Sequence, residues 1–371
     1  MDTAVEAALR AEIIEWVQHR AQANGGYLHR HELLAFRAGG RDLPLIDYSR
    51  GIRNPADFAS TLAIVQSAHG PDDDVEDPTD GLLHYAYRSG DPFGGDNRKL
   101  RAAIETGMPL ILFRKETANF YTPIAPVYVV DDVPEDSCFL IALDESFRYM
   151  PDVRHLSEPQ RAYALRLAKQ RLHQPAFRTR VLLAYETRCA VCTLRHGSLL
   201  DAAHIAPDAS ELGVPTTPNG LALCKIHHAA FDQQMLGVTP DYVVHIDREL
   251  MDEIDGPMLR HGLQEMHGRT LTLPRRPADH PDRDLLAHRW ESFTHCAASG
   301  TTRQRQAPLV SVRHHFVSVR HHSSASGTNS SVRRSTPRTS PTERHDVQVC
   351  RRRARRRQSR AHLRPRNVHG V

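Results

Sequence analysis

Hydrophobic runs long enough to cross a bilayer, which takes about 20 apolar residues, are missing from this 371-residue chain. The stretch that begins at Met1 has neither the basic start nor the apolar core of a secretory signal. Cysteine is scarce, with 6 residues in all, and three of them fall in one short segment, which argues against a disulfide framework. We therefore expect a cytoplasmic protein without a membrane partner.

Acidic residues and lysine are nearly missing from the last part of the chain. Residues 301–371 contain 17 Arg, no Lys, and only Glu343 and Asp346 as acids, so they carry +15. Because the whole chain carries +4, the preceding 300 residues carry −11. Because residues 1–300 carry a net negative charge, they do not attract nucleic acid through their overall charge. Any DNA contact in this part of the chain must use local patches of positive charge.

The tail, residues 297–371, is rich in Ser, Thr, Arg and His and poor in apolar residues. Such a segment cannot bury enough surface to fold alone, and we expect it to be disordered. Its Arg351–Arg357 run could bind nucleic acid nonspecifically, or the tail could be an extension without a selected role.

The rest of the chain alternates between helical and β-type patterns, which predicts an α+β protein. Residues 3–24 show a helical period in the apolar positions Val5, Leu9, Ile13, Trp16 and Val17. A second helical stretch at 97–106 lies among five β-type runs at 61–66, 82–87, 109–113, 126–130 and 138–142. We expect a helical segment at 1–49, a β-rich domain at 50–150, a helical linker at 151–188, a core at 189–246, its extension at 247–296, and the tail.

Four metal-binding side chains are spaced as in a closed zinc site. Cys189 and Cys192 form one short pair, and Cys224 and His227 form a second pair after a long loop. Three thiolates and one imidazole would fill the four positions of a tetrahedral zinc ion and leave no open one. We therefore predict a structural zinc that stabilises a short element with little core of its own.

Further polar residues in the same stretch are not needed for the zinc. Residues 225–234 have a helical pattern in which His228 and Asp232 are four positions apart and so share one face. These two side chains suit a second divalent ion with open positions, whereas His227 points about 100° away toward the zinc. His204, at the end of a short β-type run, is a candidate general base opposite that ion.

The order Cys-x2-Cys, His, Asn, Cys-x2-His-His, x3-Asp over residues 189–246 resembles the HNH (ββα-metal) nuclease family. The resemblance implies that His204 activates the attacking water and that Asn219 holds the loop between two strands and orients this base. It also implies that His228 and Asp232 bind Mg²⁺ or Mn²⁺, which stabilises charge on the scissile phosphate. The products would be 5′-phosphate and 3′-hydroxyl ends.

One position departs from the family pattern. Many members have Asp or His immediately before the general base as another metal ligand, and this chain has Ala203 there. Asp201 lies two residues earlier, on the same face of the expected strand, and could reach the ion directly or through water. Otherwise the ion keeps two protein ligands and waters, which Mg²⁺ tolerates.

The runs Arg171–Phe177, Asp255–Leu259 and Leu271–Pro274 extend the likeness over roughly residues 158–296 to bacterial HNH proteins described as predicted restriction endonucleases, in which a reading module often precedes the nuclease. By Gly51-Ile52, Asp72–Asp74, Asp80-Gly81, Tyr85, Tyr87 and Asp96-Asn97, residues 50–145 resemble a divergent SRA (YDG) module, the fold that flips a modified cytosine out of the duplex. A flipped base needs an aromatic ring to stack on and a polar group to read its edge. The candidate DNA-reading residues are Asp72, Tyr85 and Tyr87. Alternatively, the two tyrosines are ordinary strand residues on one face of a sheet.

These patterns predict a modification-dependent (type IV-like) restriction endonuclease that acts on double-stranded, possibly base-modified DNA. Two alternatives stay open. The N-terminal domain could recognise something other than a modified base, or the protein could be a nonenzymatic zinc-stapled DNA-binding protein whose active site has decayed at Ala203. Because one HNH site cuts one strand, a homodimer would supply the two cuts of a double-strand break.

Overall fold

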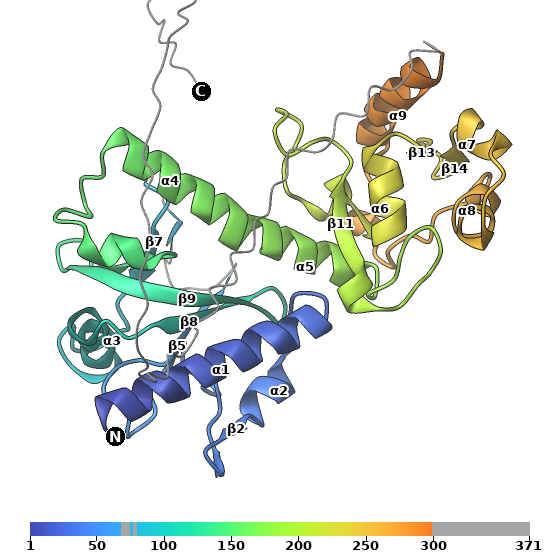
Figure 1. Ribbon diagram of the computed structural model, residues 1–371. Helices are drawn as coiled ribbons and strands as arrows, with labels where there is room; N and C mark the ends of the chain where they lie inside the picture. Colours follow the sequence, from blue (N-terminus) through green and yellow to red (C-terminus); the bar gives the residue numbers. More distant parts are fainter. Residues whose placement is uncertain (68–74, 77–79, 299–371) are drawn as a thin grey trace, which may run out of the picture. The chain divides into compact units, whose positions relative to one another are not determined.

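A computed structural model describes residues 1–67, 75–76 and 80–298 (Figure 1). The chain divides into two units, Met1–Gln304 and Arg305–Val371, and the described residues all belong to the first unit. Asp72 and the tail from residue 299 onward lie outside them. None of the helices in the described ranges is long and apolar enough to span a membrane.

An eight-stranded sheet occupies the N-terminal half of the described chain. Its strands are β1 (Leu28–His29), β4 (Ile52–Arg53), β5 (Ala63–Ser67), β6 (Val75–Glu76), β7 (Leu83–Ala86), β8 (Leu110–Lys115), β9 (Phe120–Val133) and β10 (Cys138–Ala142). The order is β4-β5-β8-β9-β10-β7-β6, with β1 paired to β9. Only the β5–β8 pair is parallel within this sheet as described. Each of the five predicted β-type runs overlaps one of these strands, β5, β7, β8, β9 or β10.

Helices cover both faces of the sheet. Ile111 and Phe113 of β8 share a core cluster with α1 (Thr3–Ala23), whereas Leu110 and Leu112 share another with α3 (Gly95–Thr106). Successive side chains of a strand point to opposite faces, so an unbroken apolar run belongs to a strand buried on both sides. The predicted helix at 97–106 is therefore confirmed as part of one of these layers.

Helix α1 forms where its sequence period predicts and buries Ile13 and Val17 of the predicted face, but it also buries two charged residues that the period does not include. Val5 is 57% exposed, whereas Glu6 and Arg10 are fully buried. The Arg10 guanidinium donates to Glu6 Oε1 at 2.8 Å and to the carbonyls of Thr61 at 2.8 Å and Pro109 at 2.7 Å. A buried ion pair whose hydrogen bonds are all made can replace apolar residues on a core face, and a hydrophobic period does not detect it.

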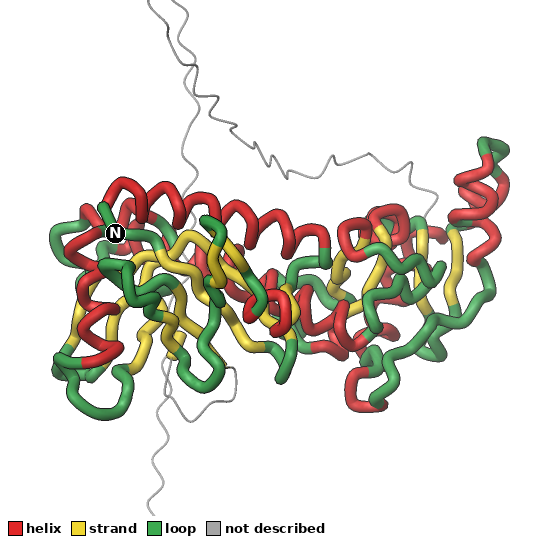
Figure 2. Tube along the Cα trace, turned by 90° about the horizontal axis from the view of Figure 1, so that it is seen from below, coloured by secondary structure: helices red, strands yellow, loops and turns green. Residues whose placement is uncertain are grey.

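One long helical rod connects the sheet to the C-terminal half (Figures 1 and 2). It consists of α4 (Glu158–Ala168), a π-helical turn at Lys169–His173, and α5 (Gln174–Ala184). The wider turn lies before Pro175 and contains the position four residues before the proline, where a tight α-turn would clash with the ring. Ala168 and Leu172 belong to a core of the sheet, and Phe177 and Val181 belong to the next core.

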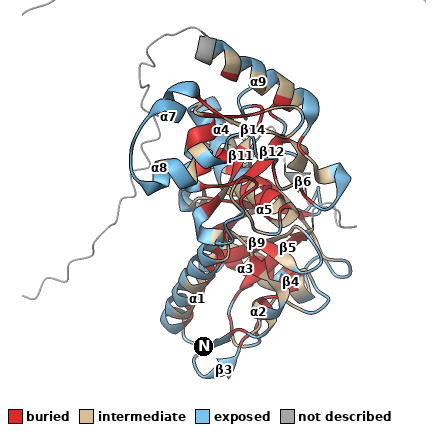
Figure 3. Ribbon diagram, turned by 90° about the vertical axis from the view of Figure 1, so that its right-hand side faces the viewer, coloured by how far each residue is buried: buried red, intermediate tan, exposed pale blue. Residues whose placement is uncertain are grey.

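The second core surrounds a small antiparallel hairpin and a helix. The elements are β11 (Leu200–His204), β12 (Gly220–Cys224), α6 (Lys225–Asp232), β13 (Leu236–Val238), β14 (Val244–Ile246), α7 (Arg248–Asp252), α8 (Pro257–Gly262) and α9 (Arg283–Ala298). Shorter pieces are α2 (Arg30–Leu34), β2 (Arg37–Ala38), β3 (Arg41–Asp42) and 3₁₀ turns at Glu145–Tyr149, Gly197–Leu199, Thr217–Asn219, Gln264–Met266 and Pro277–Asp279. Leu221, Phe231 and Leu286 lie in this core, whereas α7 and α8 contribute no buried residue (Figure 3).

Candidate active site

The hairpin and helix of the second core fix the positions of the predicted site residues. Strands β11 and β12 pair in a register that sets Leu200 opposite Cys224 and His204 opposite Gly220. Helix α6 begins directly after β12, so Cys224 stands at the junction of strand and helix. The two short strands β11 and β12 are therefore followed by the helix α6, in the ββα order that the resemblance predicts.

The four predicted zinc ligands come together. The ligand atoms of Cys189, Cys192, Cys224 and His227 all lie within 4.8 Å of one another. The Cys192 and Cys224 sulfurs are 4.0 Å apart, close to the edge of about 3.8 Å expected for a tetrahedron with zinc–sulfur bonds of about 2.3 Å. Hydrogen bonds from the other two thiols lower the pKa of Cys224, which favours the thiolate that binds metal. The donor set and its spacing fit a zinc ion.

The imidazole of His227 is oriented from outside the motif. Its Nδ1 faces Cys224 Sγ at 3.1 Å, and its Nε2 lies 2.8 Å from the carbonyl oxygen of Gly262 at the end of α8. A hydrogen bond from Nε2–H fixes the tautomer that presents Nδ1 to a metal. The exposed extension is thereby tied to the metal cluster.

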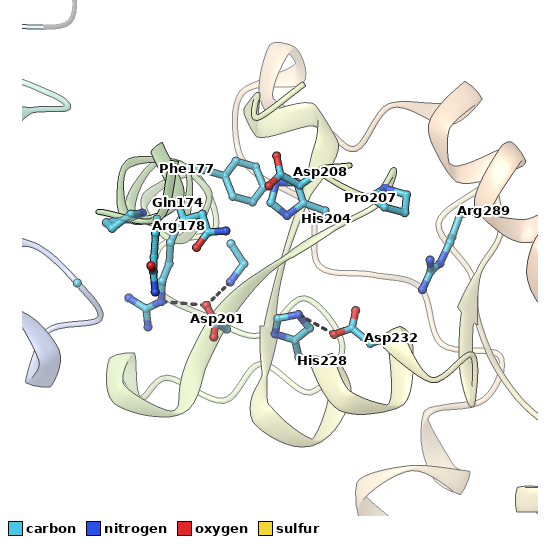
Figure 4. A pocket seen from close by; sticks show the side chains of 14 residues that line it. Gln174, Phe177, Arg178, Asp201, His204, Pro207, Asp208, His228, Asp232 and Arg289 are labelled. Carbon is cyan, nitrogen blue, oxygen red and sulfur yellow. Dashed lines mark hydrogen bonds and ion pairs between the residues drawn. The ribbon is translucent and has the colours of Figure 1, made fainter. Parts of the chain in front are cut away.

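A cavity of about 540 Å³ brings the other predicted residues together (Figure 4). His204 lines it from the end of β11, and His228 and Asp232 line it from α6. His228 Nε2 is 3.3 Å from Asp232 Oδ2, as expected for neighbours one turn apart. The imidazoles of His204 and His228 thus share one cleft.

His204 is held against an aromatic ring. Its imidazole stacks on Phe177 of α5, with ring centroids 4.0 Å apart and planes inclined by 17°. Burial lowers the pKa of His204, and its buried Nε2 has no hydrogen-bond partner among the described residues. Such a histidine is neutral at neutral pH and can accept a proton.

Asn219 fastens the loop that connects the two strands. Its side chain is fully buried and accepts from the backbone N–H of Ala206 at 2.8 Å. Its amide nitrogen donates to the carbonyls of Ala206 at 3.2 Å and Val214 at 3.1 Å. Both ends of the loop after His204 are therefore fixed to one side chain.

Asp201 lines the same cavity, but two cations already hold its carboxylate. Arg178 Nε lies 3.0 Å from one oxygen, and Lys225 Nζ lies 2.7 Å from the other. Burial raises the pKa of Asp201, yet these cations and His228 outweigh burial and leave the pKa below its usual value. Ala203 is fully buried in the core of this half. An anionic carboxylate is thus available at position 201 and not at position 203.

Sequence reasoning missed three groups that line the cavity. Asp208 follows β11 and pairs with Lys169 at 2.8 Å, Gln174 comes from the start of α5, and Arg289 comes from α9 (Figure 4). No local spacing links them to the motif. Their positions depend on how the π-helical rod and α9 pack against the hairpin.

The tyrosines proposed to read DNA are engaged inside the N-terminal domain. Tyr85 has no exposed surface, and its hydroxyl donates to the Gly51 carbonyl at 3.1 Å, so it cannot stack on a base without opening the core. Tyr87 packs on Phe139 and hydrogen-bonds Asp132; burial, followed by that bond, raises its pKa to about 12. These contacts fit the alternative in which both tyrosines pack on one face of the sheet, Tyr85 within β7 and Tyr87 directly after its end.

A comparison with protein families finds a match to "HNH endonuclease" over residues 189–239. Among solved structures, the chain is similar to "Modification dependent TagI restriction endonuclease", with 18% identity over 66% of this chain and 86% of that chain and a TM-score of 0.26. No curated protein matches. The chain contains an HNH endonuclease domain, and the protein is a DNA-cleaving enzyme.

Proposed function

We propose that the protein hydrolyses DNA phosphodiester bonds with His204 as general base and a divalent ion bound by His228 and Asp232. The observation that carries this proposal is the shared cavity, which receives His204 from a strand and His228 from the facing helix. A base on one side and metal ligands on the other are what in-line attack of water on a phosphate requires.

His204 would remove the proton from the attacking water. Its neutral imidazole accepts that proton while the new bond between oxygen and phosphorus forms and the bond to the 3′ oxygen breaks. Phe177 limits rotation of the ring through the stack, and Asn219 fixes the loop that follows it. The phosphate stays on the 5′ oxygen of the downstream fragment, and the departing 3′ oxygen takes a proton from solvent to become a hydroxyl.

The donor set suits Mg²⁺ or Mn²⁺ at the second site. His228 and Asp232 would bind the ion, and the anionic Asp201 would act directly or through water in place of the ligand missing at Ala203. Such an ion stabilises negative charge on the phosphate and on the departing oxygen. The Cys₃His cluster would hold a structural zinc that keeps α6 in place.

We further propose that the sheet domain selects base-modified DNA. With Tyr85 in the core, the candidate pocket moves to a cavity of about 220 Å³ lined by Arg50, Arg88, Asp91 and residues 94–97. This volume lies below the range of about 300–1,000 Å³ typical of drug-sized ligands and suits a smaller group such as one flipped base. Arginine, carboxylate and amide groups there offer the donors and acceptors that read a base edge.

Plasmid cleavage tests both parts. Wild-type protein and His204→Ala are incubated with methylated and unmethylated plasmid in Mg²⁺. The proposal expects cutting of methylated plasmid by the wild type and at least a 100-fold slower rate for the variant. Cutting without divalent ion, or equal cutting by the variant, would contradict the mechanism. Equal cutting of both plasmids by the wild type would contradict only the selection of modified DNA.

The same cleavage assay tests whether two copies of the protein act together. If two copies cooperate in a double-strand break, the linear product should form without a long-lived nicked intermediate.

A further inference from the structure

The helical rod forms one wall of the cavity. Gln170, Gln174 and Arg178 line the cavity at intervals of four residues, and residues four apart lie on one face of a helix. Gln170 belongs to the π-helical turn, and Gln174 begins α5. In Figure 4 Gln174 and Arg178 stand on the same side of the cavity as Phe177. This wall precedes residue 189, so it lies outside the segment that matches the HNH family.

Two ion pairs flank the two glutamines and fix the wall relative to the proposed base. Lys169 Nζ pairs with Asp208 Oδ2 at 2.8 Å, and Arg178 Nε pairs with Asp201 Oδ1 at 3.0 Å. Asp201 lies on β11 and Asp208 follows it, so both pairs anchor the wall to the strand that ends at His204. The backbone positions of the glutamines are therefore set before a substrate binds, which reduces the entropy lost on binding.

The side-chain amides of Gln170 and Gln174 are available to a ligand. Both side chains are exposed, and neither amide has a hydrogen-bond partner among the described residues. The cations on either side of them, Lys169 and Arg178, are already paired with carboxylates. Each amide offers two N–H donors and one carbonyl acceptor without a net charge. Between its two ion pairs, the wall thus presents neutral donors to whatever enters the cavity.

Under the proposed function, the group that enters the cavity is the backbone of a DNA strand. His204 and His228 must lie on either side of the scissile phosphate, so the sugar–phosphate chain of the cut strand passes through the cavity. A volume of about 540 Å³ falls in the range typical of drug-sized ligands, so the cavity holds more than one ion and one phosphate. Glutamine side chains are among those that donate to phosphate oxygens and fix the register of a protein on DNA.

We infer that Gln170 and Gln174 donate hydrogen bonds to phosphate oxygens next to the scissile phosphate and so align the bound strand with His204. This inference rests on the proposed function, because that function places the scissile phosphate in this cavity. The two glutamines act as positioning residues and take no part in proton transfer. A displacement of about 1 Å between reacting groups can lower a rate about 100-fold, so their loss should affect cleavage as well as binding.

The test uses the full chain with its metals and measures DNA affinity over a range of salt concentrations. His204→Ala serves as the background that binds DNA without cutting it. Gln170→Ala and Gln174→Ala are compared in this background with Gln22→Ala, because Gln22 is an exposed residue of α1 that does not line the cavity. Loss of a neutral donor releases no counterion, whereas loss of one cation–phosphate contact lowers the slope of log affinity against log salt by about 1.

We expect Gln170→Ala and Gln174→Ala each to weaken DNA binding by about 10-fold at every salt concentration, with an unchanged slope. Gln174→Glu nearly keeps the shape of the side chain but replaces its donors with a negative charge, so it should bind DNA more weakly than Gln174→Ala. With His204 intact, single-turnover cleavage at saturating DNA should be slower for the same variants. Gln22→Ala should change neither measurement, and the melting temperature should stay at the wild-type value throughout.

The outcomes separate this inference from the proposed function. Wild-type affinity in either alanine variant overturns the role of that glutamine, whereas cutting by His204→Ala overturns the proposed function itself. A slope that falls by about 1 also contradicts the inference, because the lost contact would then belong to a neighbouring cation. If an alanine variant does not fold, Gln174→Glu decides, since wild-type binding by a side chain without donors is incompatible with a phosphate contact.

Discussion

The imidazole of His204 lies flat against the ring of Phe177, at a centroid distance of 4.0 Å. Phe177 belongs to α5, the part of the helical rod that packs into the nuclease core. The stack helps to bury the imidazole, and burial keeps the pKa of His204 below its usual value. The rod therefore influences the protonation of the proposed base.

The pH dependence of cleavage follows from this contact. Burial lowers the pKa of His204, and so do Lys169 and His228, whereas Asp208 and Asp232 raise it, with a net lowering. The rate should be constant at neutral pH and fall only below about 6.5, as His204 becomes protonated. Phe177→Leu should move this midpoint upward. Identical single-turnover pH profiles for wild type and Phe177→Leu would contradict the role of the stack.

Asp201 should affect the metal requirement. Asp201→Asn removes the negative charge while nearly keeping the shape, and we expect the Mg²⁺ concentration for half-maximal rate to rise by about 10-fold or more. Asp208→Asn is the matched control, because Asp208 lines the same cavity but pairs with Lys169. Equal Mg²⁺ midpoints for wild type and Asp201→Asn would remove Asp201 from the proposed ligand set.

Asn219 should matter for both stability and rate. Asn219→Ala leaves the buried N–H and carbonyl of Ala206 without their partner, at a cost of about 1–3 kcal/mol for each group. We expect a lower melting temperature of the nuclease half and slower cleavage, since the loop after His204 is released. Asn119→Ala, an exposed amide in the sheet domain, should change neither measurement. A stable Asn219→Ala that cuts at the wild-type rate would refute this role.

Zinc should be bound by the cysteines of the nuclease half. Cys224→Ser removes one thiolate, and we expect loss of bound zinc in metal analysis together with loss of cleavage, because α6 begins directly after this residue. Cys138→Ser, a buried free thiol of the sheet, should keep both. Full activity of a zinc-free Cys224→Ser protein would show that the cluster is not needed.

The spacing of residues along the sequence predicted those parts of the site that lie on the β11–β12 hairpin and on α6. The clustering of the four predicted zinc ligands and the approach of His228 to Asp232 follow from the residue spacing and the helix period, so the sequence was sufficient to predict them. Arg289, and the Gly262 carbonyl that orients His227, come from distant segments and depend on packing that no local pattern encodes.

The N-terminal half was predicted in outline and differed in detail. Five strands formed where apolar runs occur, because such runs favour strands buried on both faces. The burial of Tyr85 depends on which face of β7 meets the core, and the burial of Arg10 depends on Glu6 and on distant carbonyls. Contacts with distant segments of the sheet determine whether these two side chains are buried. The hydrophobic period of the sequence alone does not predict such contacts.

Chemical rescue tests the proposed base most directly. His204→Gly leaves a space beside Phe177 where free imidazole can bind, so single-turnover cleavage is followed in Mg²⁺ as the imidazole concentration rises. We predict that imidazole restores a large part of the lost rate in His204→Gly and none in His204→Gly combined with His228→Ala. Cleavage by His204→Gly at the wild-type rate without imidazole would contradict the assignment of His204 as the base.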